Sequence, residues 1–166
     1  MATIREISKA RLVIALMYSD KSIFEEVKEI LIDNFGEIEF TSEEYDFNFT
    51  GYYENEFGKS LKKIFIIFKK PINREELVGI RLYTQELEDK FTDDNKRKVN
   101  IDPGYITRDN LIMASLKEQP YKIYLGKGVF AHMIFMFKRN GIISFKHSFP
   151  DYLAQKDFFI MVRKSL

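Results

Sequence analysis

Residues 99–107 read Val-Asn-Ile-Asp-Pro-Gly-Tyr-Ile-Thr, an alternating strand pattern that runs into a carboxylate followed by Pro-Gly. Asp102 can accept hydrogen bonds from nearby amides, Pro103 fixes one dihedral angle and Gly104 tolerates a positive one, which is typical of a type II turn. The stretch therefore predicts an edge strand and its exit from a sheet. Because polar residues that leave an edge strand can also line a cleft, Asp102 and Tyr105 are candidate ligand contacts.

The chain up to this stretch alternates between strand and helix patterns. Residues 12–18 and 64–68 are continuous apolar runs, which are typical of strands buried on both faces. The expected order is a strand at 12–18, a helix from Asp20 or Ser22 to Phe35, an edge strand within 37–50, a strand at 64–68, a helix from Asn73 to Phe91 and a strand at 98–101. This order predicts an α+β protein that begins with a ferredoxin-like βαββαβ unit, in which the two apolar strands are central.

Two helices cover only one face of such a sheet, so the rest of the chain is expected to cover the other. An antiparallel meander is predicted at 121–125, 129–137 and 142–147, with the hairpin signals Gly126-Lys127-Gly128 and Asn140-Gly141 at its joints. The pattern at 110–117 leaves a strand and a short helix open, and a last helix is expected after 149–152.

No repeat, low-complexity tract or Pro/Gly-rich linker divides the chain. We therefore expect a single domain over residues 1–166. It has a ferredoxin-like half at 1–108 and a half at 109–166 that holds the β-meander and the C-terminal helix. The meander should cover the open face of the sheet, and a cleft between the two halves is the natural place for a ligand.

Composition excludes several classes of function. With 26 basic and 25 acidic residues the net charge is only +1, so no overall field attracts nucleic acid or anionic lipid. The absence of cysteine excludes thiol nucleophiles, thiolate metal sites and disulfides, and is compatible with a reducing cytoplasm. The apolar run at 12–17 follows Arg5, Lys9 and Arg11, but it is too short for a membrane span and lacks a small-residue cleavage site.

Two familiar catalytic patterns are present only as fragments. Gly58-Lys59-Ser60 resembles the end of a phosphate-binding P-loop, but Tyr53 stands where the first Gly is required, and a strand follows instead of a helix. His132 and His147 have neither a second His at metal-ligand spacing nor a Cys to complete a site, and no nucleophile elbow accompanies them. We interpret both histidines as polar residues on a partly exposed sheet.

Loop carboxylates are a more plentiful source of polar contacts: Asp46, Glu54, Glu56, Asp102 and Asp151. Magnesium or calcium accepts such ligands. In a ferredoxin-like sheet, however, Asp46 and Asp102 lie three strand spacings apart, about 14 Å, which is too far to share one ion. We therefore predict no metal site. Asn100 and Asp102 form one polar cluster, and the loop 52–56 is either a flap over a ligand or an exposed loop packed by its own aromatic rings.

Basic side chains gather near the same strand ends and suggest an anion-facing rim: Lys59, Lys62, Lys63, Lys69, Lys70, Lys96, Arg97 and Lys98. Acidic residues at 37–46 lie close to them in the sequence. Because charge clusters at strand ends are usually solvated, this pattern argues against nucleic-acid binding.

Several ordered blocks resemble one known family. They are Asp46-Phe47-Asn48-Phe49-Thr50 with Tyr52-Tyr53-Glu54, Val99-Asn100-Ile101-Asp102-Pro103-Gly104-Tyr105, Ile123-Tyr124-Leu125-Gly126 and Phe149-Pro150-Asp151-Tyr152. From about Leu12 to Tyr152 the chain is similar to the bacterial domain-of-unknown-function family DUF4416. The resemblance implies a small cytoplasmic bacterial protein and no particular reaction. Members are sometimes labelled GTP-binding, a label that the interrupted P-loop does not support.

Three hypotheses for the function follow. The first is a protein that binds a small molecule or anion, such as a nucleotide or phosphate, in the cleft. Its candidate ligand contacts are Tyr53, Glu54, Asn100, Asp102, Tyr105, Tyr124 and Asp151. The second is an interaction or assembly module whose edge strands pair with a partner or a second copy of the chain. The third is a magnesium-dependent phosphoryl-transfer or hydrolytic enzyme. The sequence assigns no catalytic residue and no cofactor.

Overall fold

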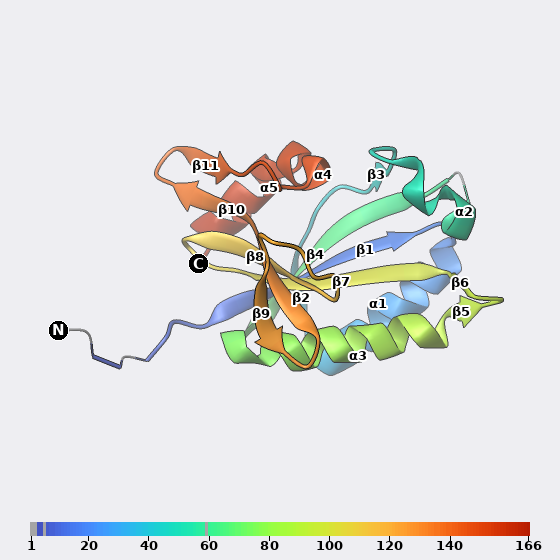
Figure 1. Ribbon diagram of the computed structural model, residues 1–166, viewed down its shortest axis with the longest axis horizontal. Helices are drawn as coiled ribbons and strands as arrows, with labels where there is room; N and C mark the ends of the chain where they lie inside the picture. The colour runs from blue at the N-terminus through green and yellow to red at the C-terminus, as the bar shows by residue number, and fades with distance from the viewer. Residues whose placement is uncertain (1–2, 5, 59) are drawn as a thin grey trace.

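The computed structural model of the protein describes residues 3–4, 6–58 and 60–166. Arg5 of the basic N-terminal pattern and Lys59 of the P-loop-like turn lie outside the described residues. The chain forms a mixed α+β structure in which a mainly antiparallel sheet has helices on both of its faces (Figure 1).

The strands of the main sheet are β1 (Ala10–Tyr18), β2 (Ile38–Thr41), β3 (Tyr45–Asp46), β4 (Lys62–Ile72), β7 (Val99–Ile106), β8 (Asn110–Ser115), β9 (Ile123–Gly126), β10 (Val129–Lys138) and β11 (Gly141–Ser144). A separate small hairpin consists of β5 (Thr92–Asp93) and β6 (Lys96–Arg97). The helices are α1 (Lys21–Phe35), α2 (Glu54–Phe57), α3 (Leu77–Lys90), α4 (Pro150–Ala154) and α5 (Lys156–Lys164), with single 3-10 turns η1 (Gly51–Tyr53) and η2 (Arg74–Glu76).

The strand order of the main sheet is β11-β10-β8-β7-β1-β4-β2, with β3 also paired to β4 and β9 to β10. The expectation that the two apolar runs are neighbouring strands is confirmed, since Ile14 pairs with Ile66 and Leu16 with Ile64. Their apolar character on both faces reflects this position, because β1 has a strand on either side and packed layers above and below.

The strands of the first half lie in the order β7-β1-β4-β2, with the two apolar strands in the middle as expected. The sheet does not end at β7, however, as the predicted ferredoxin-like unit with a separate covering meander would require. The second half of the chain continues the same sheet, because β8 pairs with β7 through Tyr105 and Ile112. Strand β7 is therefore not an edge strand, and part of its backbone is satisfied by β8 rather than left exposed. The face opposite α1 and α3 is covered by α4 and α5 together with β10 and β11 (Figure 1).

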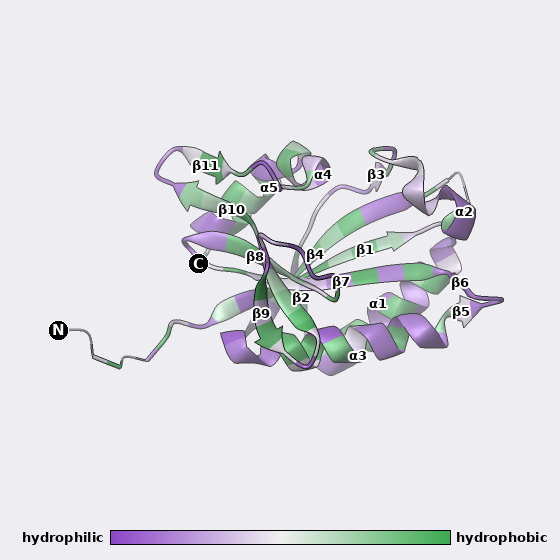
Figure 2. Ribbon diagram, in the orientation of Figure 1, coloured by the Kyte–Doolittle hydropathy of each residue, from purple (hydrophilic) through white to green (hydrophobic). Residues whose placement is uncertain are grey.

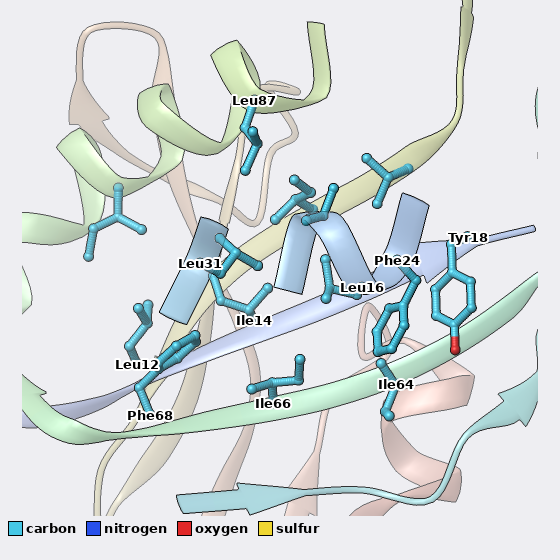
Figure 3. Close-up of a cluster of buried hydrophobic side chains, with 14 of the residues drawn as sticks. Leu12, Ile14, Leu16, Tyr18, Phe24, Leu31, Ile64, Ile66, Phe68 and Leu87 are labelled. Atoms are coloured by element: carbon cyan, nitrogen blue, oxygen red, sulfur yellow. The ribbon is translucent and has the colours of Figure 1, made fainter. Parts of the chain in front are cut away.

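Alternate residues of β1 contribute to two hydrophobic layers. Leu12, Ile14 and Leu16 point towards α1 and α3, where Phe24 and Leu31 of α1 pack on them (Figure 3). A second cluster lies on the other face of the sheet: Val13, Ala15, Phe65, Phe135, Tyr152 and Phe159. Figure 2 shows hydrophobic residues along β1, and hydrophobic and hydrophilic residues side by side on α3. Each large side chain buried in this way stabilises the fold by about 1.5–3 kcal/mol.

The helix starts follow the sequence signals. Asp20, rather than Ser22, caps α1 by accepting a hydrogen bond from the Ser22 amide at 2.8 Å. Asn73 and Glu76 form the expected capping box before α3. These side chains satisfy backbone N–H groups that have no partner within the helix.

The predicted turn at residues 102–104 is wrong. Strand β7 runs through it, and Gly104 pairs with Val13 on one side and Met113 on the other without a positive φ angle. A Cβ atom on Gly104 would collide with Met113 Sδ and with the backbone oxygen of Ile112. Glycine is therefore required for the close approach of β8, not for a turn.

Other local predictions had mixed outcomes. The hairpins at 126–128 and 140–141 are confirmed, and residues 110–115 form a strand. The expected edge strand within 37–50 is only β2 and β3, because Phe47 leaves the sheet to pack against the cluster of Met17, Phe57 and Leu61.

Candidate functional site

A cavity of about 540 Å³ opens where β7 and β8 separate. Their ladder joins Gly104–Ile106 to Leu111–Met113 and extends no further. Beyond it, β7 and the end of β8 contribute opposite walls, and the loop 47–53 and the start of α4 close the remaining sides. The cavity is thus lined by residues from both parts of the chain. Most of them lie on the face of the sheet that carries α4, and α3 on the other face contributes Arg81 and Gln85.

Where β8 no longer covers β7, a side chain from α3 replaces it as a hydrogen-bond acceptor. Thr107 directs its N–H towards β8 and bonds to Asn110 O at 2.9 Å. Pro103, four residues before Thr107 and therefore facing the same side, has no N–H to donate. The N–H of Ile101 bonds instead to Glu88 Oε1 of α3 at 2.5 Å. The carboxylate of Glu88 replaces a neighbouring strand at this point and satisfies the N–H of Ile101 where the sheet opens.

A polar network forms the floor of the cavity next to this opening. Arg97 binds Glu56 through two bonds, of 2.6 Å from Nε and 2.9 Å from Nη2, and its Nη1 donates to Asn100 Oδ1 at 2.7 Å. Asn100 in turn donates to Asp102 Oδ2 at 2.7 Å. The hydrogen bonds from Arg97 hold the pKa of Glu56 below its usual range. This bidentate geometry fixes the guanidinium of Arg97 in place.

Glu88 lies beneath the floor and is fully buried. Burial, followed by the charge of Asp102, raises the pKa of Glu88 to about 7 against the pull of Arg81 and Arg97. The buried Arg81 lines the cavity from α3, where it bonds to Thr84 Oγ1 at 3.1 Å and to Gln85 Oε1 at 2.9 Å.

Two lysines line the cavity from the side of β8. Lys122 Nζ donates to Ser115 Oγ at 2.7 Å and to the backbone oxygen of Lys117 at 3.2 Å. Lys117 Nζ lies 5.0 Å from the centre of the Tyr52 ring. Burial and the neighbouring charge of Lys117 lower the pKa of Lys122. Within the described residues, neither ammonium group forms an ion pair with a carboxylate.

A buried ion pair borders the opposite side. Lys63 Nζ lies 2.6 Å from Asp151 Oδ2, and both side chains are 6% exposed. The ammonium is also 4.6 Å from the ring centre of Tyr152 and 5.1 Å from that of Phe47. The hydroxyl of Tyr45 donates to Asp151 at 3.2 Å, and burial together with Asp151 raises the pKa of Tyr45. Aromatic faces and a carboxylate thus both compensate the loss of water around Lys63.

Aromatic side chains line much of the remaining wall. The ring centre of Tyr53 lies 5.9 Å from that of Phe47 and 5.1 Å from that of Tyr52. Burial, followed by Asp102, raises the pKa of Tyr53 to about 12, so its hydroxyl keeps its proton at neutral pH. Tyr53 and Asp102 therefore lie close enough to influence one another across the cavity.

His132 is buried at the end of the cavity beside Phe149. Its Nε2 lies 3.1 Å from the backbone oxygen of His147, and because a carbonyl only accepts, Nε2 carries the proton. Burial and Lys122 lower the pKa of His132 to about 4, so the ring is neutral at physiological pH. His132 is thus a buried residue, not the partly exposed one that the sequence predicted.

Comparison with known proteins identifies a family. A family described as a domain of unknown function, DUF4416, matches residues 8–166. The chain belongs to DUF4416. The resemblance seen in the sequence blocks is confirmed, and it extends from before β1 to the C-terminus. No curated protein and no solved structure matches the chain.

Four of the ligand contacts predicted from this DUF4416 sequence line the cavity: Tyr53, Asn100, Asp102 and Asp151. They come from η1, β7 and α4, which are far apart in the chain. Asn100 and Asp102 share a face because successive strand residues alternate.

The other three predicted contacts lie elsewhere. Glu54 begins α2 and is exposed. Tyr105 is three residues from Asp102 on β7, so its side chain points to the opposite face of the sheet. There Arg74 of η2 lies 6.0 Å from its ring centre. Tyr124 on β9 is 61% exposed. The cavity does not include these three residues.

The sequence did not lead us to select the polar residues that α3 contributes to the cavity. Arg81 and Gln85 line it, and Glu88 lies just beneath. Their spacing of four and three residues places them along one stripe of α3, beside the apolar positions. A polar stripe that borders a buried helix face was the signal that would have found them. Lys117 and Lys122 lie in an irregular segment, where no periodicity marks them.

Over residues 3–4, 6–58 and 60–166, no group of three or more His, Cys, Asp or Glu side chains is arranged to hold a metal ion. No helix in these ranges is both long enough and apolar enough to span a membrane.

Proposed function

We propose that the cavity binds a small molecule that carries an anionic group and a planar ring. The observation that carries this proposal is the pair Lys117 and Lys122, two neighbouring ammonium groups that face the cavity without a carboxylate partner among the described residues. Lys122 is partly buried and Lys117 is exposed, and the charge of Lys117 helps to lower the pKa of Lys122. A bound anion removes the cost of this repulsion.

The rest of the lining supports the ring. Phe47, Tyr52 and Tyr53 present aromatic surface on one wall. Offset or edge-on packing against such rings favours a planar ligand. The volume of about 540 Å³ is in the usual range for small-molecule sites. Asp102 forms no ion pair in the described chain and accepts one hydrogen bond from Asn100, so it is suited to receive a donor group of the ligand.

The same proposal treats residues 1–166 as one cytoplasmic domain, with the site between residues 1–108 and 109–166. Two observations support it. Strand β7 pairs with β8, and one hydrophobic cluster contains both Val13 from the first part and Phe159 from the second. A site formed between two parts of one chain is a common place for a ligand.

A thermal-shift comparison tests the binding proposal. Nucleoside monophosphates and aryl sulfonates, which have both a ring and an anion, should raise the melting temperature more than nucleosides or inorganic sulfate. The double substitution Lys117→Gln/Lys122→Gln should abolish that rise. A matched control is Lys156→Gln/Lys164→Gln, which removes the same charge from exposed positions of α5. No rise with any ring-bearing anion, or an equal loss in the control, would refute the proposal.

A second candidate function is self-association through β9. This strand pairs with β10 and exposes Ile123 at 68%, Tyr124 at 61% and Leu125 at 42%. An apolar edge strand of this kind can pair with the same edge of a second copy around a two-fold axis. Light scattering should then detect a dimer that Ile123→Lys dissociates and Ile143→Lys, on β11, leaves intact. A monomer at high concentration would exclude this candidate.

A further inference from the structure

We propose that the buried Arg81 and the partly buried Arg97 form a second anion subsite of the cavity, and that Glu88 serves as its internal counter-ion until a ligand anion replaces it. This inference rests on the proposed binding function, because it concerns the same cavity and the anionic part of the same ligand. It adds a specific subsite and a proton that is taken up on binding.

The geometry shows a counter-ion that is close to both arginines but loosely paired with them. Glu88 Oε2 lies 3.9 Å from Arg81 Nη2 and 3.5 Å from Arg97 Nη1. Both arginines line the cavity, whereas Glu88 does not and is 0% exposed. In the described part of the chain, Glu88 Oε2 and Arg81 Nε are buried without a hydrogen-bond partner. A buried donor without a partner costs free energy, so the guanidinium of Arg81 favours an additional anion nearby.

Neither arginine depends on Glu88 for its position. Arg97 is held by its bidentate contact with Glu56, and Arg81 is held by Thr84 and Gln85. The two guanidinium groups therefore stay in place when the charge of Glu88 changes. Preorganised donors of this type bind anions without having to reorganise.

Glu88 can lose its charge without losing its structural contact. Oε1 accepts the N–H of Ile101 and closes the open edge of β7, while Oε2 is free to carry a proton. Protonation therefore leaves the Ile101 bond intact. It also removes the negative charge that competes with a ligand anion for the two arginines.

The charges around Glu88 set the direction of the coupling. Arg81 faces it from α3, Arg97 from β6 and Asp102 from β7. Burial and Asp102 place the pKa of Glu88 at about 7. A ligand anion beside the arginines acts as Asp102 does and raises this pKa further. Binding is thus accompanied by proton uptake and strengthens as the pH falls through neutrality.

Isothermal titration calorimetry with 2-naphthalenesulfonate tests the subsite, because this probe has a ring and an anion whose charge is constant near neutral pH. If only the neutral form of Glu88 admits the anion, the dissociation constant should rise about tenfold between about pH 6 and about pH 8. Titrations at about pH 7 in two buffers with different ionisation enthalpies should show uptake of about half a proton.

Three variants separate the subsite from a general pH effect. Glu88→Gln, which can still accept the Ile101 N–H, should bind the probe with an affinity that no longer depends on pH. Glu86→Gln, an exposed position on the same helix, should keep the tenfold dependence. Arg81→Gln should weaken binding most at low pH and thereby flatten the profile, which provides a readout even if Glu88→Gln does not fold.

The outcomes distinguish this inference from the function on which it rests. Binding of the probe with an affinity that is constant across this pH range, or a tenfold dependence that survives Glu88→Gln, would overturn the subsite and leave the binding function standing. Absence of binding at every pH would overturn the proposed function, and the subsite with it.

Discussion

The buried ion pair of Lys63 and Asp151 gives a sharp test of the structure, because the adjacent residue provides a matched control. Lys63 and Asp151 lie 2.6 Å apart with side chains 6% exposed. Lys62 and Asp46 lie at the same 2.6 Å, but their side chains are 38% and 74% exposed. The two pairs therefore have similar geometry and differ mainly in their contact with water.

The expected magnitude follows from what each substitution leaves behind. Lys63→Met leaves the buried carboxylate of Asp151 with Tyr45 as its remaining partner, and removing one member of a buried pair costs about 3–5 kcal/mol. Asp151→Asn should cost less, because an amide oxygen still accepts from the ammonium and the faces of Tyr152 and Phe47 still attract it. The double variant should be more stable than the sum of the single losses predicts, by about 1 kcal/mol or more.

Urea unfolding, with linear extrapolation to water, measures these free energies. Lys62→Met should leave the free energy of unfolding unchanged within experimental error, because exposed pairs contribute little. Equal losses for Lys62→Met and Lys63→Met, or strictly additive effects of Lys63→Met and Asp151→Asn, would refute the reasoning.

Two further predictions concern packing and protonation. Gly104→Ala should lower the free energy of unfolding by about 1–3 kcal/mol in the same urea assay, because the added methyl group must displace Met113 or the β8 backbone; an unchanged midpoint would contradict the close approach of β7 and β8. The pKa of His132 is lowered from 6.5 to about 4 in the folded protein, so the stability that its neutral ring provides is complete above about pH 6.5 and is lost as the pH falls towards 4. Thermal unfolding across this range should show a steeper acid loss for the wild type than for His132→Gln, and parallel curves would count against a buried neutral ring.

Much of the local structure could be predicted from the sequence, because its causes are local. The apolar runs at 12–18 and 64–68 indicated adjacent strands, and Asn73 with Glu76 indicated the start of a helix. The turn residues at 126–128 and 140–141 indicated the hairpins that join β10 to β9 and to β11. Each of these signals depends on hydrophobic period, capping or backbone conformation within a few residues.

The prediction failed where a residue had two possible reasons for its identity. Pro103-Gly104 reads as a turn, but Gly104 is a glycine because β8 approaches it closely, and Pro103 lies where the β8 ladder has ended. A glycine required by a distant segment looks in the sequence the same as one required by its own φ angle.

The candidate site likewise contains some residues that the sequence could indicate and others that it could not. Asn100 and Asp102 could be selected from the sequence, because strand alternation places both on one face. Glu88 could not, since on a helix it reads as an ordinary solvated carboxylate until the open edge of β7 is known to require an acceptor. Lys117 and Lys122 became candidates only when the end of β8 brought them opposite β7.

The sequence by itself determined the secondary structure signals, the two-sided burial of β1 and β4, and the membership in DUF4416. Only the tertiary structure decided that the second half extends the first sheet, and that a charged cavity opens where β7 and β8 part. The physical reason is the distance along the chain over which each kind of interaction acts. Propensity and periodicity act between neighbours in the chain, whereas an open strand edge, a buried counter-ion and two lysines that line one cavity exist only after distant segments have packed together.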